Sequence, residues 1–130
     1  MSYIGRIQDL AEQNSFFRKV IFTGKKSQLV VMDIKSGEDI GEETHDHVEQ
    51  TLYFFAGEGK AVLNGKESPL HPGDVLIVTP GTKHNVINTG KTSLKIATVY
   101  APPNHIDGRV HKTKADAVAD DEDEAFGERQ

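Results

Sequence analysis

The chain contains no cysteine, which excludes disulfide bonds and thiolate metal sites. No apolar run approaches the length of a membrane span, and the N-terminus lacks the charged and then apolar pattern of a secretory signal. No phosphate-binding loop, dinucleotide fingerprint or Gly-x-Ser-x-Gly nucleophile motif is present. From these absences we expect a cytoplasmic protein whose chemistry, if it has any, runs through a bound metal ion.

The chain also lacks an excess of positive charge, since its formal net charge is −5 over 130 residues. This balance argues against a nucleic-acid or anionic membrane surface. Much of the negative charge lies near the C-terminus, in Asp116 and the run from Asp120 to Glu124. We therefore expect one domain over residues 1–118 and a flexible, solvated acidic tail over residues 119–130.

Short β-prone segments separated by Gly, Pro and Asn turns fill most of the remaining chain. Asn64-Gly65 is a strong hairpin signal, because both residues tolerate positive φ. Residues 4–14 carry apolar side chains at helical spacing and predict one short amphipathic helix. Long helices alternating with strands are missing, so the pattern predicts an all-β sandwich or barrel preceded by that helix.

The segment from Thr51 to Phe55 is apolar on both faces, which requires a cover on each side. One cover is the barrel interior, and the other is the N-terminal segment or a second subunit. Residues 101–116 follow the last predicted strand and would wrap across the barrel mouth or a neighbouring subunit. We expect His105 and His111 in this segment to be exposed, with a second site or a lid as the alternative.

A set of histidines gives the main functional signal. Residues 40–47 are expected to form a strand, and alternate residues of a strand point to one face, so His45 and His47 would project together. Gln50 follows closely, and His84 lies in a later strand. Converging imidazole nitrogens with an oxygen ligand suit a divalent first-row metal, so the sequence favours a metal site over a merely polar, water-filled pocket.

The residues around these histidines resemble the two motifs of the cupin family. The first is Gly41 to Gly57, which contains His45-Asp-His47 and Gln50; the second is Gly73 to Asn88, which contains Pro80-Gly81 and His84. The resemblance implies a double-stranded β-helix, that is, a jelly-roll barrel. It also implies one metal ion on His45, His47, Gln50 and His84, and a homodimer.

Gln50 stands where cupins usually have a glutamate. A neutral amide leaves the charge of a divalent ion uncompensated, which should weaken binding and make the ion a stronger Lewis acid. Glu43 and Glu49 are the alternative sources of negative charge, and they are also the candidate general bases. The ligand set does not identify the ion, which could be zinc, manganese, iron, nickel, cobalt or copper.

The family resemblance implies several activities without selecting one, because a fold does not fix a reaction. Our first expectation is a metal-dependent enzyme of the isomerase or dioxygenase kind, acting on a small polar substrate such as a sugar or an oxo-acid. The alternative is a barrel that binds a small ligand without turnover, with or without a metal.

Overall fold

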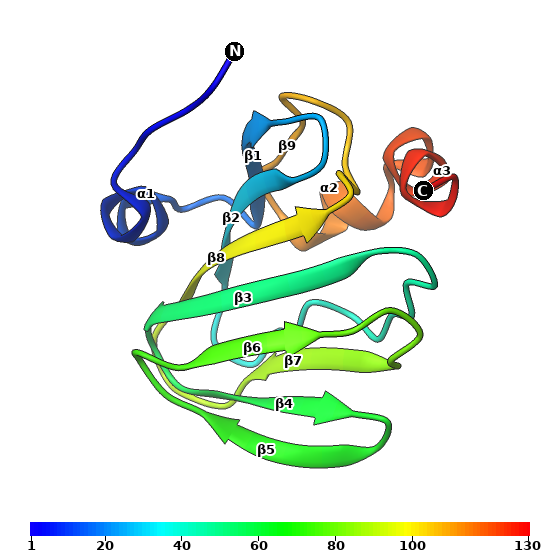
Figure 1. Cartoon of the computed structure of the whole chain (residues 1–130). Helices are drawn as coiled ribbons and strands as arrows, with labels where there is room; N and C mark the ends of the chain where they lie inside the picture. Colours follow the sequence, from blue (N-terminus) through cyan, green and yellow to red (C-terminus); the bar gives the residue numbers. More distant parts are fainter.

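The computed structural model describes residues 1–130 as two antiparallel sheets with three short helices (Figure 1). The elements in chain order are α1 (Ile7–Gln13), β1 (Arg18–Thr23), β2 (Gln28–Ile34), β3 (Glu49–Ala56), β4 (Gly59–Leu63), β5 (Lys66–Leu70), β6 (Val75–Val78), β7 (His84–Asn88), β8 (Leu94–Ala101), β9 (Val110–His111), α2 (Lys114–Val118) and α3 (Asp121–Glu128).

The larger sheet has six strands in the order β6-β3-β8-β2-β1-β9, and the smaller has three in the order β5-β4-β7. Strands distant in sequence are neighbours in both sheets, as when β8 lies between β2 and β3. The hairpin between β4 and β5 turns at Asn64 and Gly65, whose φ angles are 49° and 83°. The predicted all-β architecture and this hairpin are therefore confirmed.

A single apolar core lies between the two sheets. It contains side chains from β2, β3 and β8 of the larger sheet, and from β4, β5 and β7 of the smaller one. Met32, Ile34 and Leu52 are almost completely buried in it. The alternation of each strand places these residues inward and leaves their sequence neighbours for the outer face.

Helix α1 covers the outer face of the larger sheet, where it contacts β2, β3 and β8. Ala11 of this helix packs with Val31 and Ala97 in a second small core, and Phe55 lies against the same cluster. The N-terminal segment is therefore the cover that the doubly apolar β3 strand requires. Tyr53, on the same outer face, lies beyond the cluster and remains 37% exposed.

The predicted strand over residues 40–47 is wrong. This segment makes only isolated bridges, from Asp39 to Ile87 and from Glu43 to His84, and it bends at Asp46 and His47. The backbone N–H of Gly81 donates to the carbonyl of His45 (2.8 Å), outside any strand ladder. The period-two argument that placed His45 and His47 on one face therefore does not apply.

The acidic C-terminal segment is helical, which differs from the flexible tail that its composition suggests. Thr113 and Asp116 form a capping box at α2, and the Asp120 side chain accepts from the Asp123 N–H at α3. Acidic residues in a first helical turn are favourable because they face the positive end of the helix dipole. The density of acidic residues alone did not indicate these helix-capping residues. No helix of the chain is long and apolar enough to cross a bilayer.

Two neighbouring residues of β3 provide a test of this layering. Phe54 is 1% exposed in the core, so Phe54→Ala should reduce the free energy of unfolding by about 3–5 kcal/mol. Tyr53→Ala, on the outer face, should cost no more than about 1 kcal/mol. Urea denaturation followed by circular dichroism measures both values. Similar losses in the two variants would contradict the assignment of the faces.

Candidate metal centre and pocket

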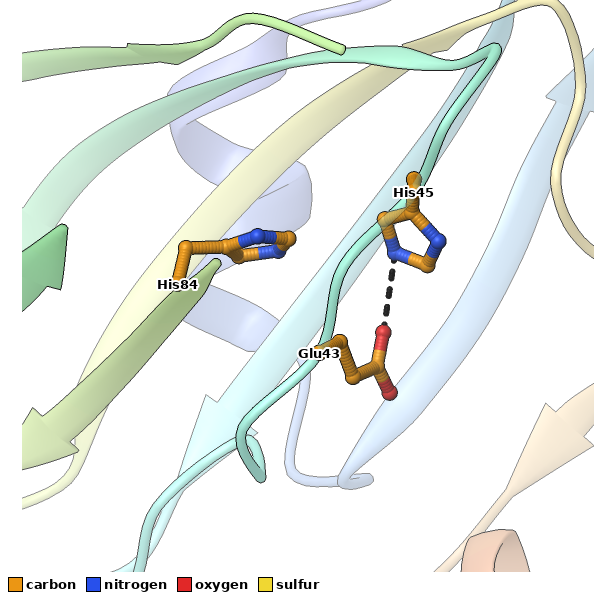
Figure 2. A group of neighbouring side chains, drawn as sticks. All are labelled: Glu43, His45 and His84. Atoms are coloured by element: carbon orange, nitrogen blue, oxygen red, sulfur yellow. Dashed lines mark ion pairs between the residues drawn. The ribbon is translucent and has the colours of Figure 1, made fainter. Parts of the chain in front are cut away.

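Glu43, His45 and His84 converge near one end of the barrel (Figure 2). One potential ligand atom from each residue lies within 4.8 Å of the others. His45 Nε2 is 2.9 Å from a carboxylate oxygen of Glu43, and the rings of His45 and His84 are 5.4 Å apart between centroids. Two imidazoles and a carboxylate form a donor set that suits several first-row divalent ions.

Backbone pairing brings these three residues together. The N–H of Glu43 donates to the carbonyl of His84 (2.9 Å), and the N–H of His84 donates to the carbonyl of Glu43 (2.8 Å). Figure 2 shows His84 at the start of β7, pointing toward the loop that carries the other two side chains. The site therefore spans a strand end and a loop that is fixed to it.

His84 is 5% exposed, and its Nδ1 lies 2.9 Å from the carbonyl oxygen of Thr82. Because that oxygen can only accept, Nδ1 carries the proton and the lone pair is on Nε2. Burial lowers the pKa of His84 below its ordinary value, which outweighs the bond to Thr82. His84 is thus neutral, the form that binds metal ions.

The Glu43 carboxyl is ionised. Burial acts to raise its pKa, but the hydrogen bond from His45 and the charges of His45 and Arg18 outweigh this effect. The pKa of Glu43 is therefore lowered from its ordinary value. Glu43, which the sequence offered only as an alternative, is the carboxylate that the fold places beside two of the predicted histidines.

The other predicted site residues occupy different positions. His47 is exposed and lies outside the group of three, although it lines the same pocket. Gln50 is 3% exposed on β3, and its amide donates to the Thr98 hydroxyl (3.2 Å). Glu49 precedes it on the opposite, exposed face of the strand.

A pocket of about 630 Å³ opens beside the cluster. Glu43, His45 and His47 line one part of it, and residues of the C-terminal segment, including α2 and α3, line another. The segment after β8 therefore wraps across the barrel mouth, one of the two arrangements that the sequence suggested. It also adds functional groups that the family motifs do not contain.

Arg18, at the start of β1, lines this pocket and is 6% exposed. Its Nη1 lies 3.4 Å from His111 Nδ1, and His111 Nε2 lies 2.8 Å from a carboxylate oxygen of Asp120. Arginine is only a donor, so His111 accepts at Nδ1 and donates from Nε2. A lone arginine at the start of a strand gave no signal in the sequence.

His105 lines the same pocket, and its Nδ1 lies 2.7 Å from a carboxylate oxygen of Asp123 in α3. The buried side chain of Gln28 fixes this region: its oxygen accepts from the N–H groups of Asn104 and His105. Its amide donates to the His105 carbonyl (2.7 Å). These contacts link residues 76 or 77 positions apart, so spacing along the chain could not reveal them.

The expectation that His105 and His111 are exposed is wrong, because they are 7% and 3% exposed. Each histidine is paired with an aspartate from the acidic C-terminal segment, which buries it against the barrel. The polar composition around these two histidines did not predict their burial. Their aspartate partners come from the segment that was expected to be a flexible tail.

Comparison with known proteins agrees with this architecture. The cupin domain matches residues 30–100, more than half of the chain. The chain belongs to the cupin family. The predicted jelly-roll fold is thereby confirmed, and β2 to β8, with the loop that carries Glu43 and His45, form the family's barrel.

Three similar proteins show how far the similarity extends. The Bacillus subtilis protein YrkC is 42% identical over 90% of this chain, which spans 66% of that relative's length. A solved structure from Bacillus halodurans is 36% identical, with a TM-score of 0.90 over 92% of this chain and 95% of that one. The oxalate-binding protein of Thermotoga maritima is 34% identical over 52% of this chain and 56% of its own.

The burial of His105 makes stability depend on pH, and its bond to Asp123 only partly offsets the effect. Burial lowers the pKa of His105 below 6.5, so the unfolded state binds this proton before the folded state does. The resulting stability is present above about pH 6.5 and is lost as the pH falls toward the folded pKa. We expect the free energy of unfolding to fall between pH 7.5 and 5.5.

Urea unfolding at pH 7.5, 6.5 and 5.5 checks this expectation. His105→Gln removes the titrating group and should make the pH dependence shallower, leaving the part due to buried His84. Equal slopes in the wild type and the variant would show that His105 does not contribute.

Proposed function

We propose that this cupin binds one divalent first-row metal ion through Glu43, His45 and His84. The observation that carries the proposal is the convergence of two imidazoles and an ionised carboxylate within 4.8 Å at one edge of a pocket. His84 offers Nε2 in the correct tautomer, because Thr82 holds its other nitrogen. The residues present therefore fit the ion that the family resemblance implies.

The two remaining predicted ligands, His47 and Gln50, differ in how well their positions suit binding of the ion. His47 borders the pocket but is exposed, so it would have to turn inward. Gln50 is buried, and because its amide nitrogen donates to Thr98, its carbonyl oxygen is the atom left for an ion. We retain Gln50 as an additional oxygen ligand and His47 as the weakest member of the predicted set.

The proposed activity is a metal-dependent reaction of the isomerase or dioxygenase kind on a small polar molecule, such as a sugar or an oxo-acid. When bound, the metal would polarise a carbonyl or position an oxygen-containing ligand. Similarity to the oxalate-binding protein of Thermotoga maritima supports a small oxygen-rich ligand. Binding without turnover is the competing proposal.

Glu43 and Glu49 were the candidate general bases. As a ligand, Glu43 would have its charge engaged by the ion, so it would contribute chiefly to metal affinity. Glu49 points to the exposed face of β3, away from the buried Gln50. A base that meets the substrate would then have to come from elsewhere in the pocket.

Elemental analysis of untagged protein tests the metal proposal. Wild type should contain about one equivalent of metal, and His84→Ala or Glu43→Gln should weaken binding by more than about tenfold. His47→Ala is the matched control, because it removes a histidine of the same loop that lies outside the group of three. Circular dichroism verifies that each variant is folded.

Retention of metal by Glu43→Gln together with its loss in His47→Ala would favour the ligand set predicted from the sequence. Gln50→Glu adds a charge at the remaining position and should raise metal affinity if Gln50 is a ligand. No metal in the wild type, even after reconstitution, would favour a metal-free binding barrel.

We also propose a homodimer formed through the outer face of β3 and β6. Val75 and Ile77 of β6 are 55% and 56% exposed, and Val75 is paired with partly exposed Tyr53. These side chains form an apolar patch on the edge strand of the larger sheet. Such a patch is typical of a surface that associates with another protein.

Sedimentation velocity tests the dimer. Wild type should sediment as a dimer, and Ile77→Glu should shift it toward the monomer by placing a charge in the apolar patch. Val118→Glu is the control, since Val118 is 70% exposed on α2, away from the patch. A monomeric wild type, or equal behaviour of the two variants, would contradict this interface.

A further inference from the structure

Arg18 is a buried cation in the pocket without a carboxylate partner. It is 6% exposed, no carboxylate oxygen lies within ion-pair distance of its guanidinium, and its Nε has no hydrogen-bond partner. Burying a guanidinium without a counterion is costly, and fully buried arginines are almost always paired. An anionic ligand in the pocket would supply the missing acceptor and charge.

The neighbours of Arg18 restrict which edge of the guanidinium can bind that ligand. Nη1 is engaged by His111, which Asp120 holds in turn. The Tyr100 hydroxyl also lies near the guanidinium, and Nε, which has no hydrogen-bond partner, leaves the edge formed by Nε and Nη2 for a ligand. Two parallel N–H donors on a planar group match the two oxygens of a carboxylate. Arg18 lines the pocket together with Glu43 of the candidate metal centre and His105 of the C-terminal segment.

His105 provides a second unsatisfied atom in the same pocket. Its Nδ1 donates to Asp123, and its Nε2 is buried without a partner. Burial lowers the pKa of His105, while Asp123 remains ionised with a lowered pKa of its own. In this neutral tautomer, Nε2 has a lone pair and accepts a hydrogen bond. A hydroxyl group is a ligand that meets this requirement.

We propose that the pocket binds a small hydroxycarboxylate, with its carboxylate on Arg18 and a hydroxyl on His105 Nε2. This inference names the ligand class of the metal-binding cupin proposed above and rests on that function only for the role of the ion. Gln28 and Asp123 are positioning residues, since they hold His105 and its tautomer without facing the ligand themselves. A pocket of about 630 Å³ is large enough for a six-carbon acid.

Three six-carbon probes separate the two contacts in isothermal titration calorimetry at neutral pH. Gluconate has a carboxylate and hydroxyls, hexanoate has only the carboxylate, and sorbitol has only hydroxyls. We expect gluconate to bind roughly tenfold or more tightly than either of the others. Equal binding of sorbitol and gluconate, or tighter binding of inorganic phosphate than of gluconate, would overturn the proposal.

Two variants assign the contacts. Arg18→Met should weaken gluconate binding by roughly tenfold or more, whereas Arg6→Met, at an exposed arginine, should not change it. Asp123→Asn can still accept from the Ile106 N–H but would donate to His105 Nδ1, which moves the imidazole proton to Nε2. This variant should reduce the preference for gluconate over hexanoate. An unchanged preference would remove His105 from the site.

Wild-type protein gives a test that does not depend on a variant folding. The Nε–H resonance of Arg18, assigned in the wild type by through-bond correlation to its own backbone, should shift on addition of gluconate, while those of Arg6, Arg109 and Arg129 stay in place. No shift of the Arg18 resonance would overturn the proposal. If Arg18→Met does not fold, this measurement decides.

The titrations use the protein as purified and after treatment with a chelator, with metal content measured on the same samples. Gluconate binding that depends on Arg18 in a protein without a metal site would refute the metal proposal and support this one. If the protein binds a metal and Arg18→Met does not affect gluconate binding, the metal proposal is supported and the hydroxycarboxylate proposal is refuted.

Discussion

Two backbone hydrogen bonds between Glu43 and His84 hold the candidate metal centre together. They join a loop that has no ladder of its own to the first residue of a strand in the smaller sheet. Because Glu43 is fixed by its backbone, its carboxylate and the His45 imidazole stay on the side of the loop that faces His84. The convergence of these three side chains is therefore a consequence of strand-edge pairing in an irregular segment.

The C-terminal segment gives the barrel mouth its second wall, and buried polar side chains hold it there. Residues 104 and 105 lie outside the strands, and the Gln28 side chain forms hydrogen bonds with their backbone. Asp123 and Asp120 then bond to His105 and His111. Each buried polar group that has a partner lowers the cost of covering the pocket, so the unpartnered atoms of Arg18 and His105 are informative exceptions.

The sequence was sufficient for the barrel. Turn residues and the two cupin motifs predicted most of the strands, and apolar residues at helical spacing predicted the helix that covers β3. His45 and His84 were predicted as metal ligands, and the fold brings these two side chains together with Glu43. The ligand geometry was less predictable, because Glu43 and His84 meet through pairing between segments 41 residues apart in number. Arg18 and Asp123 were missed because their roles depend on tertiary contacts of single residues within ordinary-looking segments.

Glu43 and Arg18 place opposite charges on two sides of the pocket. The neutral Gln50 alone would leave an ion with no negative ligand, but the ionised Glu43 would compensate part of the charge of a divalent ion. Arg18 adds a positive charge on the other side, with no carboxylate paired to it. Six carboxylates and only two cationic side chains line the pocket as a whole, so any attraction for an acid is local to Arg18 and to the ion when it is bound. Coulombic attraction is stronger in a low-dielectric site, and this local positive charge favours an acid over a neutral sugar beside Arg18.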